Sequence, residues 1–486
     1  MINHRFLLHA GLIAASSEFP ASVQADQSNP PNFIVIFTDD QGYQDLGCFG
    51  SPTISTPNLD RMAADGVRFT DFYVAAPLCS PSRGALLTGK YPARLGIAKG
   101  VFMPKSKNGL APQEITIADM LKQKDYTTAC IGKWHLGHLE PFLPLQQGFD
   151  LFFGIPYSND MWLAPGLKSA VDIKLTDGIT LERMKALCSE KRTPENAGRV
   201  PLMRGNEIVE FPADQASLTR RYTEETIRFI EQNKTCQFFV YLTPAMPHVP
   251  LYASERFRGK SRGGLYGDAV EEIDWAVGEI FQCLEKNGLS ENTLVVFTSD
   301  NGPWLSKGKD GGHALPLRNG KGSVFEGGLR VPCIMKMPGT IPAGSVCTEL
   351  ASTIDLLPTF GNMADVPLPK NLDGKDIRDL ITAKPGAKSP HDVFLYYSLD
   401  GKPSAIRQGD WKLVFGIPVI GYSRDADPKQ YPENPADFKP ELYNLGSDIG
   451  ETVNVYDQHP ELAEQMLRRA QREIQEVSPN AQVSQD

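Results

Sequence analysis

The sequence predicts an α/β fold in which a large mixed, mostly parallel sheet lies between two layers of helices, followed by a small α+β domain. Strand-like apolar runs alternate with helical runs over most of the 486 residues. Short runs typical of antiparallel strands gather after residue 385. The composition, 41% hydrophobic and 22% charged, is that of a globular protein. The length suggests two or three structural units.

The alternation begins at 32–40, NFIVIFTDD, a continuous apolar run typical of a strand buried on both faces of a sheet. The next run, 56–66, predicts a helix with Thr56 as its N-cap, Pro57 in its first turn and Gly66 as its stop. The same alternation predicts helices at 116–126, 218–233 and 268–288 and strands at 127–135, 237–248 and 292–302.

Two regions depart from this alternation. The periodicity weakens between 156 and 216, which we interpret as an irregular insertion that forms a wall of a substrate site. Beyond residue 385, short apolar runs predict an antiparallel sheet, and 459–477 predicts a terminal helix. We therefore place a large domain at 26–385 and a small α+β domain at 386–486.

The first 25 residues have the pattern of a secretory signal peptide. Arg5 precedes a short apolar stretch, and small residues follow up to Ala25, the expected cleavage point. No window of about 20 apolar residues predicts a membrane span. We expect a protein that is secreted or periplasmic.

Charge and cysteine content exclude some classes of protein. A formal net charge of −9 argues against a nucleic-acid partner, although a local basic pocket could still bind an anion. The eight cysteines contain no CxxC pair and do not predict a disulfide scaffold, which leaves one or two bridges open. The oligomeric state is left open as well.

Acidic and amide side chains follow two of the predicted strands. Asp39 and Asp40 close the run at 32–38, and Asp300 and Asn301 close the run at 292–299. In open α/β sheets, ligands bind beyond the carboxyl ends of strands. Brought together there, these four side chains would repel one another unless a hard cation lay between them, and Ca²⁺ tolerates such a mixed oxygen set better than Mg²⁺ does. Taken singly, each pair is more typical of a turn.

Basic side chains follow other strands. Lys133 and His135 lie at the end of the run at 127–135, His248 follows the stretch at 238–247, and Lys321 lies in a glycine-rich loop. Each alone is more typical of a surface group than of an active site. Glycines near Lys321 would permit the backbone to approach an anion closely, but the spacing is not that of a phosphate-binding loop.

Cys79 lies in an unusual polar stretch, CSPSR. A free cysteine is most often a small buried hydrophobe. The alternative is a nucleophilic thiolate, favoured by the start of a helix at RGALLTGK. The partners of a cysteine hydrolase are not clearly arranged around it, and carboxylate metal ligands are foreign to that chemistry.

Taken together, these motifs resemble those of the type I sulfatases in the alkaline phosphatase superfamily. CSPSR, continued by LTG at 87–89, is similar to the signature in which a maturation enzyme converts the cysteine to Cα-formylglycine (3-oxoalanine). YTTACIGKWHLG is similar to the second signature of that family. The resemblance extends over nearly the whole mature chain. Lys90 and Asp125 depart from it, because the family more often has arginine and glycine there.

The resemblance implies an alkaline-phosphatase-like catalytic domain at 26–385 that binds one Ca²⁺ per chain. Its implied ligands are Asp39, Asp40, Asp300, Asn301 and residue 79. The resemblance also implies that hydrated formylglycine 79 attacks the sulfur of a sulfate ester. The implied catalytic set is Cys79, Arg83, Lys133, His135, His248 and Lys321. Arg83 and Lys133 would orient the attacking oxygen, while Lys321 and His248 clasp the sulfate. His248 is the candidate general acid and His135 the candidate base.

The substrate is less well specified than the bond that is cleaved. We expect a sulfated carbohydrate, with outer subsites formed by the insertion at 156–216, the loop around His313, and the tail with Tyr396 and Arg407. Small aryl sulfates are an alternative, and so is a phosphomonoester or phosphodiester hydrolase of the same superfamily. A catalytically silent glycan-binding or scaffold protein is the alternative from another class.

Overall fold

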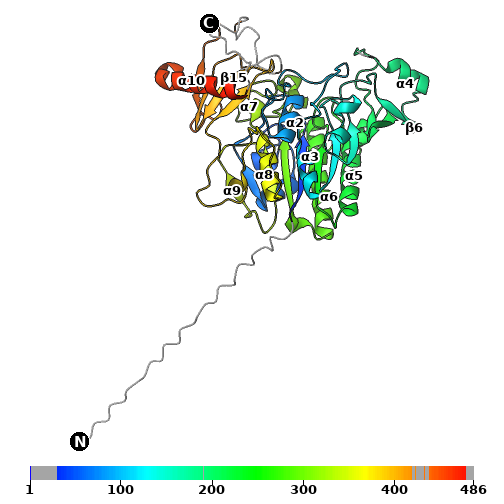
Figure 1. Ribbon diagram of the computed structural model, residues 1–486, viewed down its shortest axis with the longest axis horizontal. Coiled ribbons are helices and arrows are strands. Elements are labelled where there is room, and N and C mark those ends of the chain that lie inside the picture. Colours follow the sequence, from blue (N-terminus) through cyan, green and yellow to red (C-terminus); the bar gives the residue numbers. More distant parts are fainter. Residues whose placement is uncertain (2–29, 190, 419–421, 423–431, 433–436, 478–486) are drawn as a thin grey trace.

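The computed structural model describes Met1 and residues 30–189, 191–418, 422, 432 and 437–477. Figure 1 shows a broad α/β body with α10 and β15 at one end and α4 and β6 at the other. The predicted signal peptide lies outside the described residues, except for Met1. Within the described part of the chain, no helix combines the length and apolar character needed to cross a bilayer.

An 11-stranded mixed sheet forms the centre of the body, in the order β12-β2-β11-β10-β1-β9-β4-β5-β7-β8-β6. Its five central strands, from β10 to β5, pair in parallel. The strands are β1 Asn32–Thr38, β2 Val67–Phe69, β4 Thr127–Lys133, β5 Leu151–Ile155, β6 Lys168–Leu175, β7 Leu202–Arg204, β8 Glu207–Phe211, β9 Phe238–Thr243, β10 Thr293–Ser299, β11 Cys333–Lys336 and β12 Ser345–Cys347. β3 Phe72–Tyr73 and β13 Ala351–Ser352 form a separate pair.

Helices cover both faces of this sheet, as the alternation predicts. Every residue of β1 is buried, and its successive side chains enter two different cores. Val35 packs in the core that also contains residues of α2, α3 and α8, whereas Ile36 packs in the core with α1, α5 and α6. The helices are α1 Pro57–Ala64, α2 Cys79–Thr88, α3 Ile117–Leu121, α4 Leu181–Leu187, α5 Leu218–Gln232, α6 Gly264–Lys286, α7 Glu326–Leu329, α8 Leu356–Met363, α9 Arg378–Ile381 and α10 Pro460–Val477.

The C-terminal part contains an antiparallel sheet in the order β14-β15-β16-β17 and the helix α10. Its strands are β14 Phe394–Tyr397, β15 Pro403–Gln408, β16 Trp411–Val414 and β17 Glu441–Asn444. This matches the predicted small sheet and terminal helix. A buried ion network joins it to α7: the amine of Lys412 lies 2.8 Å from a carboxylate oxygen of Glu326 and 2.8 Å from one of Glu451.

The same network accounts for two residues that we expected in an outer substrate subsite. The hydroxyl of Tyr396 donates to Glu326 at 3.1 Å, and Arg407 donates to Asp71 at 2.8 Å. Both side chains are buried. The expectation was wrong, because these side chains connect the two parts of the chain instead of facing a ligand.

The segment 156–216 is more regular than its sequence suggests. It contains β6, β7, β8 and α4, and the three strands extend the main sheet beyond β5. The interpretation as an irregular insertion was wrong for these stretches. β6 is exposed or half-buried along its whole length, so it lacks the apolar pattern by which a buried strand is identified.

Two departures from the sulfatase signatures are accommodated locally. Asp125 has φ 60°, a left-handed conformation that glycine adopts without strain and that aspartate tolerates better than most residues do. Lys90 forms an ion pair with Glu114 at 2.6 Å. All eight cysteines are free thiols, so neither of the bridges left open by the sequence is present.

Candidate active site

The register of the central strands brings the predicted metal ligands together. β1 and β10 are parallel, with Thr38 opposite Ser299, so the residues that follow them lie side by side. The backbone amide of Asp40 donates to Asp300 at 3.1 Å, and the side-chain amide of Asn301 donates to Asp40 at 2.7 Å. The four predicted metal ligands therefore meet at one edge of the sheet.

Two consecutive aspartates serve this site because β1 ends at Thr38, just before them. In a continuing strand, Asp39 and Asp40 would point to opposite faces. Asp40 instead has φ 60°, a left-handed conformation that breaks the alternation of an extended strand. As a result, carboxylate oxygens of both residues and a ring nitrogen of His248 lie within 4.8 Å of one another.

Cys79 is the first residue of α2 and lies against these acids. Its Sγ is within 4.8 Å of carboxylate oxygens of Asp39 and Asp300, and the side chain is 3% exposed. Burial raises the pKa of the Cys79 thiol to about 12, although Lys133 and Lys321 oppose this rise. A thiol with this pKa is protonated at neutral pH, which argues against the thiolate nucleophile considered from the sequence.

Buried cations surround the cysteine and the acids. Arg83, one helical turn after Cys79, donates to a single oxygen of Asp300 from Nε at 3.0 Å and from Nη2 at 2.7 Å. The amine of Lys133 forms a very short contact with Asp39. The amine of Lys321 lies 2.7 Å from Asp40. All three predicted cations therefore belong to the same cluster.

The two histidines carry their ring hydrogen on different nitrogens. Nε2 of His135 lies 3.1 Å from the carbonyl of Phe102, which can only accept, so Nε2 carries the hydrogen. Nδ1 of His135 is buried without a hydrogen-bond partner among the described residues and is an acceptor. Burial, reinforced by Lys133, holds the pKa of His135 well below its usual value, so the ring is neutral and suited to accept a proton.

His248 has its hydrogen fixed on the other nitrogen. Nδ1 lies 3.1 Å from Oδ1 of Asn159 and 2.6 Å from the carbonyl of Val249, both acceptors. Nε2 faces Asp40 at 3.6 Å. Burial and the charge of Lys321 lower the pKa of His248. The free nitrogen therefore points into the acidic cluster.

The donor set fits a hard cation. Oδ1 of Asp39 and Oδ1 of Asn301 are buried oxygens without a hydrogen-bond partner in the described structure. Burial and the neighbouring Asp39 raise the pKa of Asp300 to about 7, whereas Lys133 holds that of Asp39 far below its usual range despite burial. Unpartnered oxygens next to crowded carboxylates are the ligands that Ca²⁺ prefers.

Two residues of this centre were missed from the sequence. Ser158 is buried and lies 3.3 Å from the amine of Lys133, and Asn159 holds His248. Both follow β5, the strand that pairs with β4 so that Lys133 lies opposite Ile155. The rule that polar residues after a buried strand mark a site could have identified them in GIPYSND, had 151–155 been assigned as a strand.

The loop around His313 has a different contact. Nδ1 of His313 lies 3.2 Å from the buried Asp45, and the side chain is half exposed. The predicted subsite role of this loop therefore remains a prediction.

Comparison with known proteins identifies the family. Residues 31–366 match the family model described as Sulfatase, and residues 319–478 match that described as N-sulphoglucosamine sulphohydrolase, C-terminal. The chain is 39% identical to arylsulfatase A of Homo sapiens over 441 residues, which cover 88% of this chain and 84% of that protein. It is 39% identical to N-acetylgalactosamine-6-sulfatase of Canis lupus familiaris over 412 residues, 80% of this chain and 73% of that protein.

A solved structure gives the same result. The crystal structure of Ps i-CgsB in complex with k-i-k-neocarrahexaose has a TM-score of 0.75 and 29% sequence identity, covering 93% of this chain and 94% of that chain. These likenesses confirm the predicted alkaline-phosphatase-like fold and the predicted class of enzyme, a sulfuric ester hydrolase. The chain belongs to the sulfatase family.

Proposed function

We propose that this sulfatase removes sulfate from sulfated carbohydrates, with Cys79 converted to formylglycine and one Ca²⁺ per chain. The observation that carries the proposal is the position of Cys79. It is buried between carboxylates of Asp39 and Asp300 and within the charge field of Lys133 and Lys321. A plain thiol gains nothing from this position, whereas an oxygen nucleophile attacking a sulfate needs both a metal and cations around it.

The proposed calcium ligands are the four strand-end residues and residue 79. The buried oxygens of Asp39 and Asn301 that lack hydrogen-bond partners among the described residues support this assignment. When bound, the ion would offset the repulsion between the carboxylates and make a hydroxyl on residue 79 more acidic. Arg83 and Lys133, which now pair with Asp300 and Asp39, would turn part of their donor capacity to that oxygen.

The proposed role of His135 follows from its proton position, and that of His248 from the place of its Nε2 in the acidic cluster. Formylglycine in its hydrated form supplies one hydroxyl for attack at sulfur and a second whose deprotonation expels the bound sulfate. His135 would accept that proton at its free Nδ1. On the opposite side, Lys321 would hold sulfate oxygens, and His248 would act as general acid in its protonated form: Nε2, which faces Asp40, would first take up a proton beside the bound anion and then pass it to the departing alcohol.

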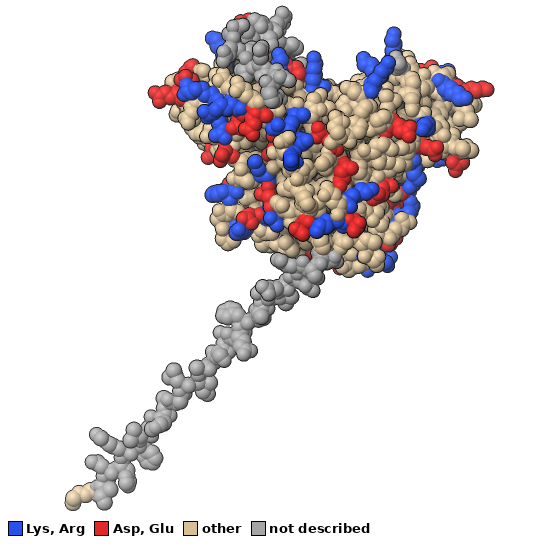
Figure 2. All heavy atoms as spheres, viewed as in Figure 1, with Lys and Arg blue, Asp and Glu red and all other residues tan. Residues whose placement is uncertain are grey.

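Carbohydrate substrates are supported by what the relatives are named for. One is an N-acetylgalactosamine-6-sulfatase, and the structure of Ps i-CgsB holds a neocarrahexaose. The predicted signal peptide at 1–25 would bring the enzyme to an extracytoplasmic compartment, where sulfated glycans occur. The net charge of −9 disfavours nucleic acid as a partner, and on the face seen in Figure 2 neither sign of charge gathers into one large patch.

The test uses protein produced together with a formylglycine-generating enzyme. Mass spectrometry of the peptide that contains residue 79 should show a loss of about 18 Da, the difference between a thiol and an aldehyde side chain. The protein should release sulfate from an aryl sulfate and from a panel of sulfated sugars. Cys79→Ala should abolish release, whereas Cys236→Ala, at an exposed cysteine outside the site, should retain it.

Two results would overturn the proposal. Full activity with an unmodified Cys79 would refute the formylglycine nucleophile. A higher kcat/KM for an aryl phosphate than for the matching aryl sulfate would favour the phosphohydrolase alternative.

A further inference from the structure

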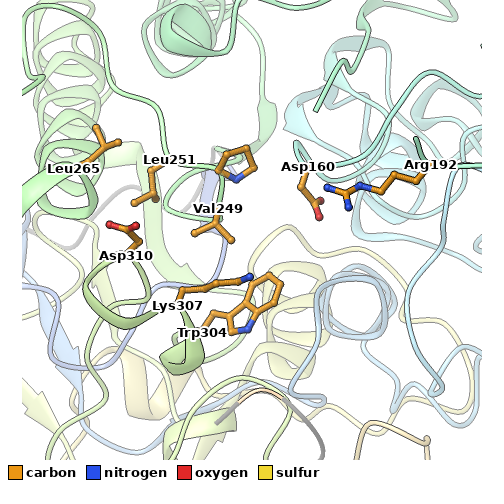
Figure 3. A pocket seen from close by; sticks show the side chains of 9 residues that line it. Asp160, Arg192, Val249, Leu251, Leu265, Trp304, Lys307 and Asp310 are labelled. Atoms are coloured by element: carbon orange, nitrogen blue, oxygen red, sulfur yellow. The ribbon is translucent and has the colours of Figure 1, made fainter. Parts of the chain in front are cut away.

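A cavity of about 420 Å³ opens beside the charged centre. Figure 3 shows its lining, in which apolar side chains and an indole face a small number of charged groups. The lining residues are Asp160, Arg192, Val249, Pro250, Leu251, Leu265, Trp304, Lys307 and Asp310. A mostly apolar wall with a few charged groups is typical of a ligand site.

The cavity is continuous with the catalytic centre through the chain itself. Three segments that each place a group at the centre also supply the cavity wall: Asp160 follows Ser158 and Asn159, Val249 follows His248, and Trp304 comes shortly after Asn301. The rings of His248 and Trp304 have centroids 5.5 Å apart. A substrate whose sulfate lies at the centre must therefore extend past these residues.

Two amines lie close to the indole ring of Trp304. Nζ of Lys321, the proposed sulfate ligand, is 4.5 Å from the ring centroid, and Nζ of Lys307, in the cavity, is 4.2 Å from it. These two distances limit the separation of the amines to about 9 Å. A second anionic substituent on the same or the next sugar falls within this span.

The charged groups of the cavity have no ionic partner in the described structure. Arg192 and Lys307 make no ion pair or hydrogen bond through their side chains with any described residue. Figure 3 shows Arg192 directed toward Asp160 on one side of the cavity and Lys307 on another side. The buried cations of the centre, by contrast, are all paired. Arginine and lysine without partners in a cavity are suited to bind a sulfate or a carboxylate.

The remaining wall fits a sugar ring. Val249, Pro250, Leu251 and Leu265 form apolar surface against which the C–H face of a pyranose can pack. The carboxylates of Asp160 and Asp310 can accept hydrogen bonds from sugar hydroxyls. A flat aromatic substrate would use the apolar wall but would leave both cations without a partner.

We propose that this cavity is a subsite for a second anionic group, a sulfate or a carboxylate, bound by Arg192 and Lys307. The group is carried by the sugar that bears the scissile sulfate or by its neighbour, so the substrates are polyanionic glycans. The proposal rests on the proposed function, because it takes the charged centre as the place where the first sulfate binds.

The experiment measures binding by calorimetry with the Cys79→Ala protein in the presence of Ca²⁺, so that no ligand is turned over. The ligands form a matched series: N-acetylgalactosamine 6-sulfate, its 4,6-disulfate, and the 6-sulfate joined to a uronate. At least one of the two doubly anionic ligands should bind about tenfold tighter than the first, which corresponds to about 1.4 kcal/mol. The ligand with the larger gain in affinity shows whether the second group is a sulfate or a carboxylate.

Variants then assign the gain to the two cations. When Arg192→Gln and Lys307→Gln are introduced into the Cys79→Ala protein, the doubly anionic ligands should no longer bind tighter than the 6-sulfate. The affinity for the 6-sulfate itself should stay within about twofold of its value in the Cys79→Ala protein. The matched controls are Lys191→Gln and Lys309→Gln, at exposed neighbours of like charge that do not line the cavity. The subsite is refuted if neither doubly anionic ligand binds tighter, or if the controls reduce binding equally.

The two proposals fail in different ways. If the mature enzyme releases no sulfate from this series or from an aryl sulfate, the proposed function fails. If it releases sulfate but the variants bind every ligand as the Cys79→Ala protein does, only the subsite fails.

Discussion

At the scale of single residues, Lys133 shows how one side chain connects two parts of the centre. Its amine contacts the carboxylate of Asp39 and lies 3.3 Å from the hydroxyl of Ser158. The carbonyl of Lys133 also accepts from Arg83 at 3.0 Å. The orientation of the amine therefore depends on Ser158, a residue that has no charge and no place in the sulfatase signatures.

We predict that Ser158→Ala lowers kcat/KM for an aryl sulfate roughly tenfold to a hundredfold, because a hydrogen bond to a charged group contributes about 1.5–3 kcal/mol. Steady-state kinetics of sulfate release would measure it. Ser169→Ala, at an exposed serine of β6, serves as the matched control and should leave the rate unchanged. An unchanged kcat/KM for Ser158→Ala would show that Lys133 needs no such support.

The residues of the centre differ in how far the sequence predicts them. Asp39, Asp300 and Lys133 follow apolar runs that are easily identified as strands, so their meeting point could be inferred. Tyr396 and Arg407 were misplaced because tyrosine and arginine are equally suited to bind a glycan and to pair with a buried carboxylate. Only the fold shows that the carboxylates of Glu326 and Asp71 lie next to them.

At the scale of elements, the start of α8 contains a pH-sensitive ion pair. Asp355, which precedes α8, accepts from the backbone amide of Ser352 at 2.8 Å and lies 2.7 Å from Nε2 of His391. Burial lowers the pKa of His391, but the attraction to Asp355 outweighs it, and the net pKa is raised above 6.5. Since the folded pKa exceeds that of the unfolded chain, the pair stabilises the fold below about pH 6.5 and loses this contribution as the pH rises through the folded pKa.

We therefore predict that, as the pH rises from about 6 to 9, the Tm of the unaltered protein falls more steeply than the Tm of the His391→Gln variant. Thermal unfolding across this pH range measures the difference in slope, which a uniform loss of stability would not change. His459→Gln, at an exposed histidine, should keep the original slope. Parallel curves for the protein and His391→Gln would contradict the assignment.

The ion network between α7 and the C-terminal sheet makes a second prediction at this scale. Lys412 is fully buried between Glu326 and Glu451, so Lys412→Met leaves two buried carboxylates without their shared cation. We expect a loss of about 3–5 kcal/mol in the free energy of unfolding. Chemical denaturation would measure this loss, and Lys402→Met, at an exposed lysine next to β15, should have little effect. A loss below about 1 kcal/mol would mean that the carboxylates take up protons at little cost.

Elements are predictable where burial imposes a pattern. The runs that became β1, β4, β9 and β10 are apolar throughout because helices cover both faces of the sheet. β7 has only three residues, and β6 at the edge of the sheet has no buried face, so neither produces a period in the sequence. The insertion was misread for this reason, whereas Ser158 was missed because the preceding run at 151–155 was not identified as a strand.

At the scale of the whole molecule, the charged centre joins parts of the chain that are more than 250 residues apart. Asp40 and Asp300 meet there from β1 and β10, and α2 adds Arg83. A cation held between these parts would stabilise the fold as a whole, because the unfolded chain cannot assemble the site.

We predict that Ca²⁺ raises the Tm, with a stabilisation of about 2.7 kcal/mol at 100 times its dissociation constant, and that a chelator reverses the effect. Mg²⁺ at the same concentration should do less, because it demands stricter octahedral geometry. Asn301→Ala should reduce the shift, whereas Asp365→Asn, at an exposed aspartate outside the site, should not. A Tm that responds to neither Ca²⁺ nor the chelator would contradict the assigned ligands.

The burial of Cys79 also sets an order of events in the life of the molecule. Its side chain is 3% exposed and lies in the charge field of Lys133 and Lys321, so an enzyme cannot reach it once the sheet has formed. The proposed conversion to formylglycine must therefore take place on the nascent or unfolded chain. Under the proposed mechanism, chains that fold before they are modified would be folded but inactive. The fraction of active molecules would then depend on the rate of modification relative to the rate of folding. Slower folding at low temperature would leave more time for modification.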